Sequence, residues 1–280
     1  MSVPQSGPAN LQCGDCDGGS GGRAHAFRLA HRFEDNEKCN NRQQIAQELH
    51  TFARSIRRFR GTHYLTAVSR VTRRLEVHPT HPQQRLLRHA AEVLREDGVA
   101  IYPTDSTYAL GCALGARDAQ VRIHRIRGDQ GTHFLTLLCR DLSELATYAR
   151  VGNQAYRLLR ALTPGPYTFV LTASRELPRR ILDPRRKTIG LRIPDHPVTQ
   201  GLLEELGSPL LSASLVHELV DEADADPDAL YDRYGALVDV FVAAGGCGIE
   251  STTMLDLVDE SAPRLLRQGR GNVSRIAGLD

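Results

Sequence analysis

Residues 99–112 read Val99-Ala100-Ile101-Tyr102-Pro103-Thr104-Asp105-Ser106-Thr107-Tyr108-Ala109-Leu110-Gly111-Cys112, an apolar run that passes directly into a row of hydroxyl side chains with one carboxylate. A short apolar run that ends at a proline is typical of a buried strand. Ligands of open α/β sheets lie at the ends of strands, where hydroxyls can hold a small polar molecule. The segment therefore predicts a strand followed by a binding site.

Helices and strands interleave on both sides of this segment. Thr80, followed by Pro82 and Gln83, predicts a capping-box start for a helix that ends at Gly98. Further strands are expected at Phe134–Cys139, Tyr167–Ala173, Thr188–Ile193, Pro209–Ser214, Val238–Ala243 and Thr252–Leu257. Further helices are expected at Asp118–Arg127, Asp141–Tyr148, Asn153–Leu162, Val198–Leu206 and Pro227–Tyr234. The alternation is not strictly βαβ, so we expect a mixed sheet flanked by helices in one α/β (α+β) domain.

Charge and composition divide the chain near residue 70. Residues 1–70 hold 10 Lys and Arg against 6 Asp and Glu, whereas residues 71–280 hold 25 against 27. Residues 1–23 are rich in Gly, Ser, Asp and Pro and are expected to be disordered. Residues 41–60 predict a basic amphipathic helix, or else belong to an upstream extension without a structural role. We expect an extension over 1–70 and a folded domain over 71–280 that lacks the global basic charge of a dedicated nucleic-acid binder.

The chain has the features of a cytoplasmic protein with no membrane contact. No run of 18 apolar residues occurs, and the N-terminus lacks the order of a secretory signal. The six cysteines are too unevenly spread for a disulfide framework, which favours reduced thiols.

Several common catalytic signatures are missing from the sequence. It contains no P-loop, no His-Glu-x-x-His and no Gly-x-Ser-x-Gly that follows a predicted strand as a hydrolase elbow requires. Cys13 and Cys16 have metal-ligand spacing but lack a second close pair, so coincidence is the default interpretation. Gly269-Arg270-Gly271 lies after the last predicted strand, where no βαβ unit can follow, and is interpreted as a turn.

The hydroxyl-rich segment resembles the Pro-Thr-Asp-Thr-x-Tyr-Gly-Leu-Gly signature of the YrdC/YciO family of threonylcarbamoyl-AMP synthase-like proteins, and its ending is most similar to the YciO branch. Further similarities follow in the order expected for the family. They are Arg125-Ile126-Arg127, Pro164-Gly165-Pro166-Tyr167-Thr168, Thr188 to Pro197, Ser212-Ala213-Ser214, Thr252 to Asp256 and Leu266-Arg267-Gln268-Gly269. The ordered set is far more specific than any single match.

This resemblance implies a YrdC-like twisted mixed sheet with a deep, concave, basic pocket. It implies an L-threonylcarbamoyladenylate synthase-type nucleotidyltransferase, which joins L-threonine, bicarbonate or CO2, and ATP with Mg2+ into threonylcarbamoyl-AMP and pyrophosphate. The product serves tRNA t6A modification, so the implied partners include tRNA and other proteins of that modification. Neither a tightly bound cofactor nor a metal site built from protein side chains is expected.

Site residues follow from the family motifs. The resemblance implies that Ser106, Thr188 and Arg192 bind threonine. Nucleotide contacts are implied for Arg125, Arg127, His133, Ser212, Ser214, Thr252 and Arg267. Thr188 and Arg192 lie four residues apart on one predicted strand, so they share a face. No nucleophilic residue is needed, because threonine carbamate attacks the α-phosphate and the protein positions the reactants and neutralises charge, with Arg125 and Arg127 as charge-stabilising groups.

Two positions depart from the family pattern: Arg125 replaces a lysine, and Ser214 replaces an asparagine. Three interpretations therefore stay open. The protein is a synthase, or a divergent YciO-type paralogue with a weaker or different reaction, or a double-stranded RNA-binding protein. The third rests on five positive charges within nine residues, which would suit the backbone of A-form RNA. These are Arg179, Arg180, Arg185, Arg186 and Lys187.

Overall fold

The computed structural model describes residues 72–128, 135–183, 185–215 and 225–275. The chain divides into two units, Met1–Val68 and Ser69–Asp280, and all described residues belong to the second. The extension expected over 1–70 therefore lies outside the described residues, and so does His133.

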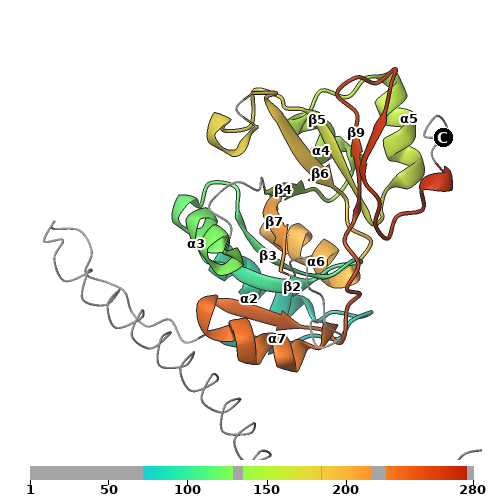
Figure 1. Ribbon diagram of the computed structural model, residues 1–280. Helices are drawn as coiled ribbons and strands as arrows, with labels where there is room; N and C mark the ends of the chain where they lie inside the picture. Colours follow the sequence, from blue (N-terminus) through green and yellow to red (C-terminus); the bar gives the residue numbers. More distant parts are fainter. Residues whose placement is uncertain (1–71, 129–134, 184, 216–224, 276–280) are drawn as a thin grey trace, which may run out of the picture. The chain divides into compact units, whose positions relative to one another are not determined.

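One sheet organises the described residues (Figure 1). Its strands run in the order β1-β8-β2-β3-β7-β4-β6-β5-β9-β10. Their bounds are β1 Arg73–Glu76, β2 Ala100–Pro103, β3 Tyr108–Ala113, β4 Thr136–Leu138, β5 Tyr167–Thr172, β6 Thr188–Arg192, β7 Leu210–Ser214, β8 Val240–Ala243, β9 Thr253–Asp256 and β10 Arg264–Arg267. The sheet contains parallel pairs, such as β4 with β6, and antiparallel pairs, such as β3 with β7. The mixed sheet predicted from the sequence is confirmed.

Six α-helices connect these strands within the described ranges. They are α2 Gln84–Arg95, α3 Arg117–Arg127, α4 Leu142–Tyr148, α5 Asn153–Leu162, α6 Pro197–Leu206 and α7 Pro227–Tyr234. Short 3-10 turns lie at Arg179–Ile181, Gly235–Leu237 and Val273–Arg275. The predicted bounds of α5 and α7 agree with the structure, and those of α3 and α6 differ by one residue at the start. None of the described helices is long and apolar enough to cross a membrane.

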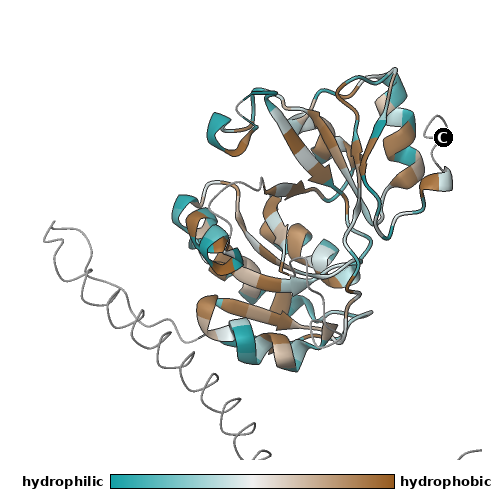
Figure 2. Ribbon diagram, viewed as in Figure 1, coloured by the Kyte–Doolittle hydropathy of each residue, from teal (hydrophilic) through white to brown (hydrophobic). Residues whose placement is uncertain are grey.

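Two apolar clusters lie on opposite faces of the sheet. Because side chains alternate along a strand, one set of strand residues packs under α3, α4, α5 and α7, and the alternate set packs under α2 and α6. Leu137 and Leu211 belong to the first cluster, and Leu138 and Leu210 belong to the second. Figure 2 shows this pattern as brown strands between helices whose outer sides are teal, most clearly on α3.

The start of α2 corrects the predicted capping box. Gln83, rather than Thr80, is the N-cap residue, and no side chain caps the helix. The Gln83 side chain instead accepts a hydrogen bond from the backbone N–H of His78 at 3.0 Å, and the Thr80 hydroxyl contacts His78 Nδ1 at 3.2 Å. The side chains of Gln83 and Thr80 thus both bind His78, in the loop before the helix, and neither caps α2. A true capping bond forms at α4, where Asp141 accepts from the N–H of Glu144 at 2.8 Å.

Three strands were missed by sequence analysis, namely β1, β3 and β10. β1 and β10 read Arg-Arg-Leu-Glu and Arg-Leu-Leu-Arg, which show no alternation of apolar and polar residues. β3 was interpreted as a row of binding residues, although its side chains are buried from Tyr108 to Cys112. It pairs antiparallel with β2, so residues Thr104–Thr107 form the turn between two neighbouring strands. We call these four residues the motif loop.

Candidate functional site

Part of one sheet face is polar instead of apolar. On the α2/α6 face, Leu210 in β7 is followed two positions later by Ser212, and Leu138 in β4 is preceded two positions earlier by Thr136. Thr136 pairs in register with Ser212 on one side and with Gly190 on the other. We name this region the polar floor. It comprises Thr136, Thr168, Thr188, Arg192, Ser212 and Thr252.

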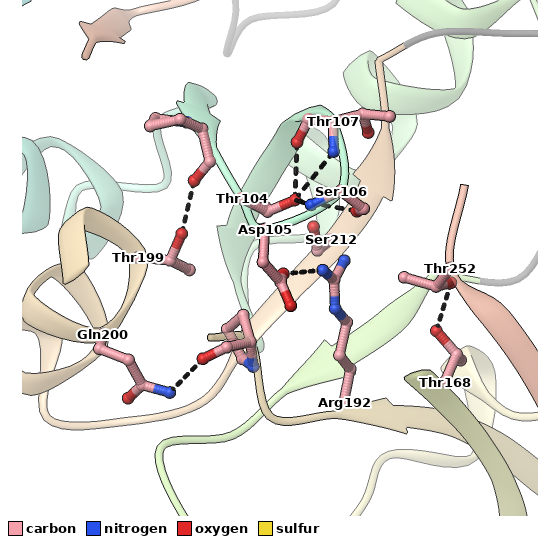
Figure 3. A network of polar contacts seen from close by, with 12 residues as sticks. Thr104, Asp105, Ser106, Thr107, Thr168, Arg192, Thr199, Gln200, Ser212 and Thr252 are labelled. Atoms are coloured by element: carbon pink, nitrogen blue, oxygen red, sulfur yellow. Dashed lines mark hydrogen bonds and ion pairs between the residues drawn. The ribbon is translucent and has the colours of Figure 1, made fainter. Parts of the chain in front are cut away.

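The motif loop lies beside the polar floor and is held by its own side chains. Thr104 Oγ1 donates to the carbonyl oxygen of Thr107 at 2.7 Å and accepts from the N–H groups of Ser106 and Thr107, each at 3.2 Å. The Ser106 hydroxyl is 3.0 Å from Thr104 Oγ1 and is buried. The loop is thus a rigid turn in which Ser106 and Asp105 are fixed relative to the sheet (Figure 3).

A buried ion pair joins the motif loop to the polar floor. In Figure 3 the carboxylate of Asp105 points at the guanidinium of Arg192, and Arg192 Nη2 donates to Asp105 Oδ1. The Arg192 side chain is 8% exposed and that of Asp105 is 10% exposed, so solvent screens the pair weakly. Burial lowers the pKa of Arg192, and Asp105 opposes that shift. Asp105 Oδ2 and Arg192 Nε are buried without a partner among the described residues.

Helix α6 holds both ends of this pair in place. Thr199 Oγ1 donates to the carbonyl oxygen of Pro103 at 2.5 Å, just before the motif loop. Gln200 Nε2 donates to the carbonyl oxygen of Pro194 at 2.7 Å, two residues after Arg192. His196, the N-cap residue of the same helix, has a buried Nδ1 without a partner in the described part of the chain. Burial lowers the pKa of His196, and Arg192 lowers it further, whereas Asp105 and Asp195 raise it.

Tyr102 closes the polar floor toward α2. Its hydroxyl donates to Ser212 Oγ at 2.6 Å, and its ring crosses Gly111 on the neighbouring strand. A Cβ on Gly111 would lie 2.6 Å from Tyr102 Cε1, so only glycine leaves room for the ring. Burial raises the pKa of Tyr102 far above its usual range, which keeps the hydroxyl protonated. Ser212 is therefore fixed as a hydrogen-bond acceptor at the edge of the floor.

Thr252 and Arg267, both assigned to the nucleotide, lie together at the other end of the floor. Thr252 Oγ1 is 2.8 Å from the hydroxyl of Thr168 in β5. Arg267 donates to the carbonyl oxygen of Thr252 through Nε at 3.2 Å and through Nη2 at 3.0 Å. Arg267 thus holds the residue just before β9, and its guanidinium is partly occupied by the protein itself.

Arg125 and Arg127 are not brought together by the structure. Both lie on α3, where residues two apart point to different sides of the helix. Arg127 Nη1 donates to the carbonyl oxygen of Ser214, at the end of β7, whereas Arg125 is exposed. Of the two, Arg127 is the one that reaches the sheet, and it brings a positive charge to the half-buried Ser214.

The five-residue basic segment is partly neutralised. Arg186 pairs with the buried carboxylate of Asp256 at 2.6 Å, and Arg180 donates to the carbonyl oxygens of Leu114 and Gly115 at 3.4 and 3.3 Å. All five members are exposed, and Arg179, Arg185 and Lys187 are the three whose side chains are not engaged in these contacts. The surface that could face a polyanion is therefore smaller than the sequence predicts.

Three functional candidates escaped sequence analysis, namely Asp105, Tyr102 and Thr168. Asp105 was noted as the one carboxylate in the motif, and its position among hydroxyls was the signal for a role. Thr168 was quoted within the Pro-Gly-Pro-Tyr-Thr match but was not assigned. Tyr102 gave no signal, because its contact with Ser212 depends on strand order. Within the described residues, no group of three or more His, Cys, Asp or Glu side chains could hold a metal ion.

Comparisons with known proteins agree on one family. A family model named for Sua5, YciO and YrdC, described as telomere recombination, matches residues 92–269. The chain is 48% identical to YciO of Escherichia coli over 197 residues, which is 70% of this chain and 95% of that protein. It is 36% identical to a threonylcarbamoyl-AMP synthase of Halorhodospira halophila over 129 residues, which is 46% of this chain and 67% of that protein.

Solved structures show the same fold. The crystal structure of E. coli YciO matches with a TM-score of 0.69 at 46% identity, over 73% of this chain and 98% of that one. A P. abyssi Sua5 crystallised with L-threonine matches with a TM-score of 0.66 at 24% identity, over 74% of this chain and 62% of that one. The synthases are thus more distant relatives than YciO. The chain belongs to the Sua5/YciO/YrdC family, and its similarity to YciO is much stronger than its similarity to the synthases.

Proposed function

We propose that this protein is a YciO-type nucleotide-binding protein whose polar floor takes ATP with Mg2+ beside L-threonine. In this proposal it runs the threonylcarbamoyl-AMP reaction more slowly than a true synthase does. The observation that carries the proposal is the buried Asp105–Arg192 pair at the junction of the motif loop and the polar floor. A fixed arginine in a water-poor site is a strong binder of carboxylate groups.

The proposed reaction has two steps that balance without a protein nucleophile. The amine of threonine adds to CO2 to form a carbamate and releases a proton. A carbamate oxygen then attacks the α-phosphorus of ATP, a new P–O bond forms, and pyrophosphate leaves with the electrons of the broken P–O bond. Mg2+ would arrive on the phosphates, whose charge it neutralises. The protein holds the reactants in line and stabilises charge.

The chain's own residues suit these tasks. Arg192 is proposed to bind the threonine carboxylate, with Ser106 and Thr188 as hydrogen-bonding groups around the amino acid. Ser212, Ser214, Thr252 and Arg267 are proposed to face the nucleotide, and Arg127 supplies positive charge near Ser214. The exposed Arg125 is the weakest candidate for charge stabilisation. A reduced rate is expected because Arg125 and Ser214 replace the lysine and asparagine of the family pattern.

Calorimetric titration and a pyrophosphate assay test this proposal. The purified chain should bind ATP with Mg2+, and it should release pyrophosphate faster when L-threonine and bicarbonate are present. Thr188→Val, which removes one hydroxyl from the floor, should weaken threonine dependence. Thr147→Val serves as a matched control, because the exposed Thr147 donates to the carbonyl oxygen of Ser143 within α4. A chain that binds no ATP, or an equal loss in both variants, would contradict the assignment of the polar floor.

Double-stranded RNA binding is a second candidate, favoured by the exposed charges of Arg179, Arg185 and Lys187. Affinity for duplex RNA should fall steeply as salt is added, because phosphate neutralisation releases counterions. Reversing Arg185 and Lys187 to glutamate should abolish binding. Arg186 is left in place in this test because it pairs with Asp256. Unchanged affinity in the double variant would assign these charges to the solvated surface alone.

A further inference from the structure

The Gly269-Arg270-Gly271 segment is held rigidly at the end of β10. Thr253 Oγ1 accepts from the N–H of Gly269 at 3.0 Å and donates to the carbonyl oxygen of Gly271 at 2.7 Å. The N–H of Arg270 donates to the carbonyl oxygen of Ser251 at 2.9 Å. A Cβ on Gly271 would lie 2.7 Å from Tyr167 Cδ1 and closer still to Tyr167 Cε1, so the close approach requires glycine. The sequence predicts this segment as a turn, and the structure shows a bend there, which fixes the backbone position of Arg270.

The side chain of Arg270 reaches back to the motif loop. A Cβ placed on Gly248 would lie 2.6 Å from Arg270 Nη1 and also 2.6 Å from the carbonyl oxygen of Ser106. The guanidinium of Arg270 and the backbone of Ser106 therefore both pack against Gly248. Arg270 is exposed, and its guanidinium makes no hydrogen bond or ion pair with any residue of the described ranges. Arg267, three residues earlier, is by contrast engaged with Thr252. A free guanidinium therefore lies next to the loop that carries Ser106.

A cavity of about 480 Å³ adjoins Arg270. Its lining includes the Pro164–Tyr167 turn, Asp195 and Asn272. The turn is tied to the polar floor, because the N–H of Gly165 donates to the carbonyl oxygen of Ile193, next to Arg192, at 3.0 Å. The volume is within the usual range for small-molecule sites. The cavity and the motif loop thus lie on two sides of one unpaired arginine.

We propose that Arg270 binds a phosphate group of the nucleotide in this cavity, beside the motif loop, as a second anion-binding residue separate from Arg192. The inference rests on the proposed nucleotide binding and extends it to a residue that the family motifs do not assign. A guanidinium presents two parallel N–H donors to phosphate oxygens and stays charged at all accessible pH values. Gly248 and the carbonyl oxygen of Ser106 fill the other side of the Arg270 guanidinium, so the open space for a phosphate is the cavity, which Asp195 also lines.

Variants of Arg270 test this placement directly. Calorimetric titrations with ATP, AMP and inorganic tripolyphosphate would compare the full chain with Arg270→Ala, Arg270→Lys and the control Arg157→Ala. Arg157 is exposed on α5, does not line the cavity and carries the same charge. Loss of one charge-assisted contact should weaken ATP and tripolyphosphate binding by roughly 10- to 100-fold in Arg270→Ala. Arg270→Lys should recover part of the affinity, and Arg157→Ala should bind as the unaltered chain does.

The outcomes separate this inference from the function on which it rests. Equal ATP affinity in Arg270→Ala and the unaltered chain would overturn the role of Arg270 and leave nucleotide binding intact. Binding of tripolyphosphate that depends on Arg270, without any binding of ATP, would support the phosphate site and contradict the proposed nucleotide. If the unaltered chain binds none of the three compounds, both proposals are wrong. A loss of equal size in Arg157→Ala would show a general charge effect and would also overturn the site.

Discussion

One face of the sheet carries two regions built from the same strands but with opposite character. Under α2 and α6, Leu138 and Leu210 are fully buried in an apolar cluster. Two residues along the same strands, Thr136 and Ser212 belong to the polar floor. The apolar region gains its stability from area removed from water, whereas the polar floor shares with the motif loop a buried ion pair whose Asp105 Oδ2 and Arg192 Nε have no partner among the described residues. The comparison separates residues that hold the fold from residues available to a ligand.

The largest effect is expected from breaking the buried ion pair of the polar floor. Arg192→Met leaves the Asp105 carboxylate buried without its guanidinium. Removal of one partner from a buried pair costs about 3–5 kcal/mol of unfolding free energy, because the remaining charge is not compensated. Urea unfolding followed by circular dichroism would measure the loss.

A double variant distinguishes charge burial from lost packing. Arg192→Met combined with Asp105→Leu removes both charges, so much of the stability should return, since apolar replacement of a buried pair is often neutral. Ligand binding should stay absent in the double variant. If the double variant is as unstable as Arg192→Met alone, the pair contributes through packing and the polar floor differs less from the apolar region than we infer.

Truncation in the apolar region tests the other side of the comparison. Leu87 on α2 is 1% exposed, and its Cδ1 lies 2.6 Å from the position that a Cβ on Gly201 of α6 would take. Leu87→Ala should cost about 2–5 kcal/mol of unfolding free energy through lost burial and a residual cavity. Nucleotide affinity measured on the folded fraction should be unchanged. A variant that folds normally but loses nucleotide affinity would extend the site beneath α2.

Gly111→Ala examines the border between the two regions. The added methyl group would lie 2.6 Å from Tyr102 Cε1 and 2.9 Å from Leu210 Cδ2, so the Tyr102 ring must move away from Ser212. Overpacking of this kind costs about 1–3 kcal/mol. The expected result is a moderate loss of stability together with weaker ligand binding. Ser212→Ala would show whether the lost hydrogen bond alone explains the binding effect, and Gly111→Ala should bind more weakly than Ser212→Ala.

The sequence predicted the elements of the fold well and the site only in part. Sequence analysis located α5 and α7 at their observed bounds, because α5 has an amphipathic face and α7 begins with Pro227 after the capping residue Asp226. It missed β10, whose four residues are all exposed and show no alternation. Short edge strands form because a neighbouring strand pairs with them, and this contribution comes from the sheet and not from local sequence.

At the site, too, local sequence predicts what lies within one element but not which residues of different elements meet. Thr188 and Arg192 were predicted to share a face from their spacing, and β6 places both on the polar floor. Arg125 and Arg127 were expected to act together, yet the helix directs them to different sides. The partner of Arg192 could not be predicted, since Asp105 lies 87 residues away in the sequence. Spacing within an element is readable from the chain, whereas pairing between elements depends on strand order.

The smallest effect concerns pH and separates His196 from its neighbours. Because burial lowers the pKa of His196 in the folded state, the unfolded chain binds more protons as the pH falls below about 6.5, the ordinary histidine value. The contribution of neutral His196 to stability is therefore complete above that pH and is lost as the pH falls through the lower folded value. His196→Asn should flatten the pH dependence of unfolding stability in this range, measured as urea midpoints between pH 5 and 8.

His81→Asn, in the loop before α2, is the matched control. An unchanged slope in His196→Asn would contradict this role of His196 and weaken the case for an ordered imidazole beside the Asp105–Arg192 pair.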